Sequence, residues 1–140
     1  MLLIEAVIWL GLARAASLAL PFRWTVRLFA LRPDPDSTAR RAGMPSAVAA
    51  VTPLLGWALR AAATRTPWKS TCLAQALAGA RMLRRRDLPG RVALGVARSA
   101  EPPRPLEAHA WLSSGEEILT GAAEAERFSV VARFTLRQPV

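Results

Sequence analysis

Cysteine and histidine are almost absent from this sequence of 140 residues, which contains one of each, Cys72 and His109. A single cysteine forms neither an internal disulfide nor a zinc cluster, so we expect a cytoplasmic protein without a metal or other cofactor. Tyrosine is missing, and the other aromatic residues are not interleaved with the arginines. We therefore expect no nucleic-acid partner, although the net charge of +9 could attract an acidic peptide or another anionic partner.

Long apolar runs without interruption are also scarce, which argues against a membrane-spanning helix. The first twenty residues are mostly apolar, but they contain Glu5 and Arg14, which would lie on opposite sides of a helix. The uncharged run 42–59 is interrupted by Pro45 and Pro53. We expect no integral membrane span, and we predict that the first helix is mostly buried.

The hydrophobic pattern changes from a helical period to an alternating period near residue 90. Before this point, helices are predicted at 2–20, 23–31, 46–63 and 71–87, with a loop at 31–37. After it, strands are predicted at 92–97, 106–112, 117–121 and 128–136. Helices followed by an antiparallel sheet indicate one α+β domain, 1–140, with a helical part at 1–66 and a core at 67–140.

Cys72 lies at the start of the helix predicted at 71–87. If Ser70 caps this helix, the unpaired N–H groups of the first turn favour a thiolate, and they could also stabilise an oxyanion. His109 lies on a later strand, on the face that it shares with Glu107 and Trp111. Thiol–imidazole hydrolases have this arrangement, but a buried structural thiol and an unrelated histidine would fit the same pattern.

Four segments that include or follow these residues resemble the peptidase half of the lasso-peptide biosynthesis B protein, a papain-related cysteine peptidase. They are STCLAQALAGARML, GRVALGVAR, EAHAWLSSGEEILTG and ERFSVV. The helical first half with LPFR is also similar, so the resemblance covers nearly the whole chain. It implies a transglutaminase-like (papain-like) core, in which the cysteine helix packs on the antiparallel sheet.

The resemblance also implies a hydrolase of ribosomal peptide maturation. Such a leader peptidase cuts a lasso-peptide precursor between leader and core and frees the core's N-terminal amine for a separate cyclase. Cys72 would be the nucleophile and His109 the base. The implied partners are the precursor peptide, a separate leader-recognition protein and the cyclase. The alternative is a weak or inactive transglutaminase-like scaffold that only binds the peptide.

The aspartate that completes the family's catalytic triad has no obvious counterpart, because all three aspartates of this chain precede His109. If Ser114 and Gly115 form a two-residue turn, the hairpin register places Thr120 opposite His109, in the aspartate's place. A threonine hydroxyl can orient an imidazole, but it cannot stabilise imidazolium as a carboxylate does.

Glu107 is the alternative third member, because it lies on the same strand face as His109. Glu116 and Glu117 are less favourable, because they lie at the turn. A Cys–His dyad, with the imidazole held by the backbone or by water, is the remaining alternative.

Overall fold

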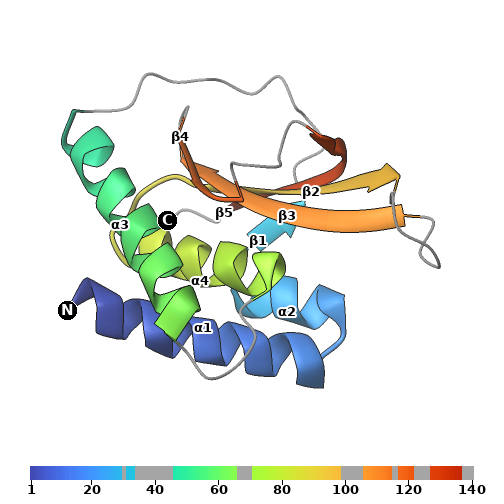
Figure 1. Ribbon diagram of the computed structural model, residues 1–140, viewed down its shortest axis with the longest axis horizontal. Helices are drawn as coiled ribbons and strands as arrows, with labels where there is room; N and C mark the ends of the chain where they lie inside the picture. The colour runs from blue at the N-terminus through green and yellow to red at the C-terminus, as the bar shows by residue number, and fades with distance from the viewer. Residues whose placement is uncertain are drawn as a thin grey trace.

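The computed structural model describes residues 1–29, 31–33, 46–65, 71–98, 106–114, 117–121 and 127–136. Figure 1 shows the elements in chain order: α1 (Leu2–Ala19), α2 (Phe22–Leu28), β1 (Leu31–Pro33), α3 (Ser46–Arg65), α4 (Cys72–Arg84), β2 (Arg91–Arg98), β3 (Leu106–Ser114), β4 (Glu117–Thr120) and β5 (Ser129–Leu136). The predicted α+β class is confirmed. The predicted boundary at residue 66 falls outside the described residues.

The five strands form one antiparallel sheet in the order β1-β5-β2-β3-β4. The sequence predicts a loop over 31–37, but Leu31–Pro33 form an edge strand that pairs with β5. A proline is tolerated there because an edge strand leaves one row of backbone groups unpaired. The rest of the predicted loop lies outside the described residues.

Helix α4 lies between the sheet and α1, and α3 packs against both helices and against β4 (Figure 1). Five of the eight buried residues of α4 are alanine or glycine, so its backbone approaches its neighbours closely. A Cβ atom on Gly79 would lie 2.4 Å from the side chain of Leu112 on β3 and 2.8 Å from that of Leu59 on α3. This packing fixes the start of α4 against the sheet.

The start of α4 differs by one residue from the prediction. Thr71 is the N-cap, and its hydroxyl accepts a hydrogen bond of 3.2 Å from the N–H of Ala74. Ser70, the predicted cap, lies outside the described residues. Cys72 is therefore the first residue of the helix. The helix also ends earlier than predicted, at Arg84, and Asp87 follows with a φ of 55° in the left-handed region that asparagine and aspartate tolerate better than most residues.

Helix α1 is less buried than predicted. Its inner face packs against α3 and α4, and its fully or nearly buried residues are Ala6, Leu10, Ala13 and Ala16. Among the described residues, α1 is the one helix that is long and apolar enough to cross a membrane, judged by length and composition alone. In this fold, it forms the outermost layer of the helical side (Figure 1).

Ion pairs join α1 to the end of α4. The carboxylate of Glu5 lies 2.6 Å from the guanidinium of Arg86 and 3.1 Å from that of Arg85. One turn further along α1, the guanidinium of Arg81 lies 5.2 Å from the ring centroid of Trp9. The hydrogen bond from Arg86 and the positive charges of both arginines hold the pKa of Glu5 below its ordinary value, although partial burial opposes this shift.

We expect Glu5→Gln to lower the free energy of unfolding by roughly 1 kcal/mol, because it removes the charge that both arginines share. A depressed folded-state pKa means that this stabilisation is complete above the unfolded-state pKa of the carboxyl and is lost as pH falls through the folded-state pKa. Urea unfolding at neutral and at acidic pH measures both effects. If the variant lost as much stability on acidification as the wild type, Glu5 would not contribute to the pH dependence.

Candidate active site

Cys72 is a free, half-buried thiol at the edge of the main hydrophobic core. It lines a pocket of about 290 Å³ whose other lining residues come from α4, β2, β3 and β5: Leu73, Leu94, Gly95, Val96, Ala108, His109, Ala110 and Val131. These residues are almost all apolar, so the pocket suits a small apolar side chain better than a charged one.

His109 lies in the middle of β3, directly opposite Gly95 of β2. Its ring stacks with those of Phe128 and Trp111, with centroid distances of 5.0 Å and 5.9 Å. A Cβ atom on Gly95 would lie within 2.9 Å of both aromatic side chains, so the glycine provides the space that they occupy. Trp111 and Phe128 form a second apolar cluster with Ala93, separate from the main core.

Cys72 and His109 both line the pocket, but their side chains lie on different sides of the sheet, and no hydrogen bond joins the thiol to the imidazole in the described part of the chain. The alternation of β3 explains the separation. Ala110 belongs to the main core on the α4 side, whereas Trp111 belongs to the second cluster, and His109 stacks with Trp111. The described pairs of β4 reach only from Ser114 back to Leu112, so β4 does not pair with β3 at His109.

The imidazole has a backbone partner that the sequence prediction did not include. Nε2 of His109 lies 3.1 Å from the carbonyl oxygen of Gly121. Because a carbonyl only accepts, Nε2 donates its proton in this bond, and Nδ1 is the nitrogen that can accept another. Gly121 has a φ of +78°, and a Cβ atom there would lie 2.9 Å from Nε2. In the sequence, the one indication that Gly121 has a special role is that a glycine directly follows the short predicted strand.

The predicted register of the β3–β4 hairpin is wrong. Ser113 pairs with Ile118, and Thr120 lies opposite Leu112, with an irregularity between these two pairs. β3 continues to Ser114 because its buried hydroxyl donates a 2.6 Å hydrogen bond to the carbonyl of Pro89. The pair nearest to the loop is Ser114 with Glu117, and Thr120 does not stand across from His109.

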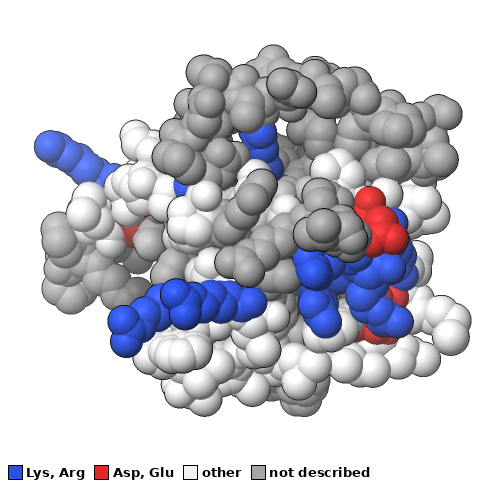
Figure 2. Space-filling model, turned by 180° about the vertical axis from the view of Figure 1, so that it is seen from behind, with Lys and Arg blue, Asp and Glu red and all other residues white. Residues whose placement is uncertain are grey.

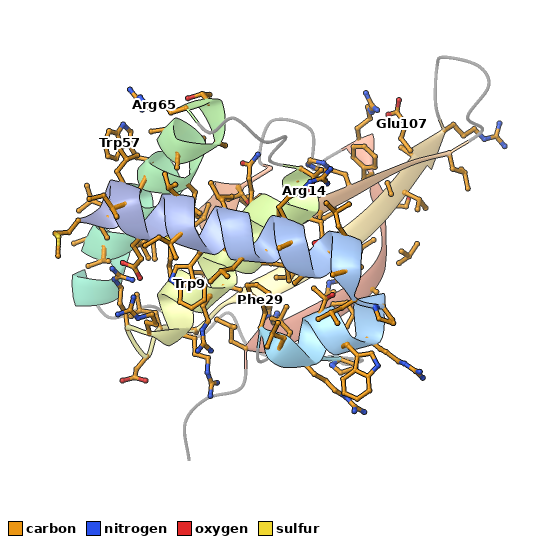
Figure 3. The ribbon with its side chains drawn as sticks, turned by 90° about the horizontal axis from the view of Figure 1, so that it is seen from below. Trp9, Arg14, Phe29, Trp57, Arg65 and Glu107 are labelled. Carbon is orange, nitrogen blue, oxygen red and sulfur yellow. The ribbon has the colours of Figure 1, made fainter. Side chains whose placement is uncertain are left out.

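Thr120 and Glu107, the two candidates for the third catalytic residue, have different surroundings. Thr120 is 2% exposed, and its hydroxyl has no hydrogen-bond partner in the described part of the chain. Glu107 lies far from α1, at the outer end of the sheet (Figure 3), and forms an ion pair with Arg127. The guanidinium of Arg127 also lies 5.0 Å from the ring centroid of Phe128, so Glu107 is connected to His109 through these two residues. The side chains of Glu116 and Glu117 are outside the described set.

The fold and the placement of the thiol agree with a comparison against protein families. The profile of the transglutaminase-like superfamily matches residues 16–133, so the chain belongs to this superfamily. Its members generally use a cysteine for catalysis. Comparisons with curated proteins and with solved structures find no match.

We expect Thr120→Val to raise the free energy of unfolding by roughly 1 kcal/mol, because it removes a buried hydroxyl that has no hydrogen-bond partner among the described residues. Thr120→Asp should lower it, because a carboxylate would be buried against Leu112 instead of facing the imidazole. Thr25→Val is the matched control, since the equally buried Thr25 hydroxyl donates to the carbonyl of Ala16, and this variant should be less stable. Urea unfolding of the three variants measures these differences. A loss of stability in Thr120→Val would mean that its hydroxyl has a partner in solution.

Proposed function

We propose that this protein is a cysteine peptidase that removes the leader from a lasso-peptide precursor and exposes the core amine for a separate cyclase. The observation that carries the proposal is the free thiol at the first position of a capped helix, in an apolar pocket that His109 also lines. The N–H groups of the first turn of α4 provide donors for an oxyanion beside this thiol. The resemblance of the sequence around both residues supplies the substrate class.

In the proposed reaction, the Cys72 thiolate attacks the scissile carbonyl after its proton passes to Nδ1 of His109. The C–N bond then breaks, and the imidazolium returns the proton to the leaving amine of the core peptide. Water, deprotonated by the same imidazole, hydrolyses the thioester and releases the leader as a carboxylate. The carbonyl of Gly121 orients the ring through Nε2, but it supplies no negative charge to stabilise imidazolium.

In the structure, the imidazole stacks with Trp111 and Phe128 on the face of the sheet away from α4, so a turn of the side chain alone does not bring it to Cys72. Proton transfer requires a local rearrangement of β3 that moves the His109 side chain to the α4 side, as a one-residue shift in register would do. Hydrogen bonds of catalytic groups often become short only in the substrate complex. We therefore propose that the thiol–imidazole pair forms when the precursor occupies the pocket.

The first test is Cys72→Ala, which should reduce leader release by about 10⁴-fold or more, the loss typical of a removed nucleophile. Alanine suits the first turn of a helix, so the circular dichroism spectrum should not change. Mass spectrometry of the precursor after incubation measures the cleavage. If Cys72→Ala still released the leader, another residue would be the nucleophile.

Labelling of Cys72 with iodoacetamide tests the proposed movement of His109. Without precursor, the wild type and His109→Ala should react at similar rates. With a precursor whose scissile bond is replaced by an uncleavable isostere, the pH dependence of labelling should differ between them. The same profile in both proteins under both conditions would contradict a role for His109 as the base.

A second prediction is that a separate leader-recognition protein accelerates cleavage of the full precursor at least about tenfold, because it raises the effective concentration of the leader at the site. Initial rates with and without this partner, at a precursor concentration below saturation, measure the effect. A peptide without the leader-binding segment but with the scissile bond is the control, and its cleavage should not depend on the partner. Equal rates for the full precursor would show that the chain binds the leader by itself.

The alternative function is a peptide-binding scaffold without catalytic activity. It is favoured by the lack of a hydrogen bond between Cys72 and His109 in the described part of the chain, and by Gly121 in place of a carboxylate at the imidazole. A scaffold would bind the precursor without cleaving it, and Cys72→Ala would bind with the same affinity as the wild type.

A further inference from the structure

The helical layer, by which we mean α1, α2 and α3, is unusually apolar on its outward side. Ten of the twelve large apolar side chains that the described residues leave exposed belong to residues 1–28 and to α3. On α1, Ile4, Ile8 and Leu12 are 63%, 55% and 50% exposed. These three residues, spaced by four, form one continuous stripe, which we call the outer face of α1.

The outer face of α1 contains no charged residue. At 100° per residue, Glu5 and Arg14 fall on either side of the stripe, and Figure 3 shows Trp9 and Arg14 leaving the helix on opposite sides. The two charges that argue against a membrane anchor in the sequence are therefore at its borders. Glu5 is in addition paired with Arg86, so its charge is largely balanced.

Tryptophan extends the apolar surface onto the neighbouring helices. Trp57 on α3, which packs beside α1, is 55% exposed, and Trp24 on α2 is 51% exposed. Tryptophan is enriched at the boundary between lipid headgroups and acyl chains, where its ring is apolar and its N–H remains hydrated. The guanidinium of Arg27 lies 5.7 Å from the centroid of the Trp24 ring, so α2 presents a cation and an aromatic ring next to each other.

The charge of the helical layer is almost entirely positive. Glu5 is the one carboxylate among the described residues of α1, α2 and α3, whereas these helices contain five arginines: Arg14, Arg23, Arg27, Arg60 and Arg65. Figure 2 shows, from behind, blue side chains above an uncharged lower edge, with red side chains beside the blue group on the right. An apolar stripe whose neighbouring helices carry arginines, and whose one carboxylate is paired, is complementary to lipid acyl chains beneath anionic headgroups.

We propose that the outer face of α1 binds the surface of an anionic lipid bilayer, with the helix lying in the plane of the headgroups. The stripe is the convex side of a single helix, which fits a planar surface. Because Arg23, Arg27 and Arg65 are exposed, they can reach lipid phosphates. This binding does not depend on the proposed peptidase activity, and it would hold the pocket near a membrane without a spanning segment.

Flotation of the full chain with lipid vesicles tests this proposal. Vesicles of phosphatidylcholine and phosphatidylglycerol in equal amounts should bind the protein, and vesicles of phosphatidylcholine alone should bind it at least about tenfold more weakly. Arg23→Gln and Arg27→Gln should each reduce binding to the anionic vesicles about fivefold, as expected for one basic residue near such a surface. Added salt should weaken binding.

Ile8→Glu should reduce vesicle binding at least about tenfold, because it places a charge in the middle of the stripe. Leu106→Glu is the matched control, since Leu106 is 57% exposed on β3, away from the helical layer, and its variant should bind like the wild type. Ile8→Ser is a milder second variant with the same expected direction, and circular dichroism verifies the fold of each. Cys72→Ala should bind vesicles like the wild type. A failure of the peptidase proposal can therefore be distinguished from a failure of the membrane proposal.

Two results would overturn the membrane proposal. The first is equal binding of the wild type and Ile8→Glu to the anionic vesicles. The second is a wild type that does not bind vesicles but self-associates, while light scattering shows that Ile8→Glu is monomeric. In the second case, the outer face of α1 would be a contact between two copies of the chain.

Discussion

The close approach of α4 to the sheet is the constraint on which the rest of the structure depends. Gly79 leaves no space for a side chain between Leu112 of β3 and Leu59 of α3, and the alanines around it keep the other contacts short. A residue with a side chain at position 79 would have to displace the ends of the Leu112 and Leu59 side chains or move α4, and with it the capped helix start that carries Cys72. The geometry of the pocket is thus set by packing about two turns away from the thiol.

The helices and strands could be predicted from the sequence because their periods reflect which side faces the core. The order of helices followed by an antiparallel sheet was correct for the same reason. Two features were not predictable from local patterns. β1 is a strand only because it pairs with β5, whereas its proline predicts a loop. The burial of α1 was overestimated because an apolar helix does not show in its sequence how many neighbours cover it.

The candidate site was predicted in part. Cys72 at a helix start and His109 on a strand follow from pattern alone and both line one pocket, but the imidazole lies on the face of the sheet away from α4. The partner of the imidazole could not be predicted, because a carbonyl is present at every residue and only the three-dimensional path of the chain selects that of Gly121. The hairpin register could not be predicted either, because β3 continues to Ser114, whose hydroxyl bonds to Pro89 on a distant segment, and the pairing shifts between Leu112 and Ser113.

The pairing of β1 with β5 has a consequence for the order in which the chain can fold. Leu31 and Leu136 are neighbours in the sheet but lie roughly a hundred positions apart along the chain, which makes this pairing one of the most non-local contacts in the fold. During synthesis, β1 has no strand beside it until β5 has left the ribosome. Helices α1, α3 and α4 can pack together beforehand, whereas β1 joins the sheet only after β5 has emerged.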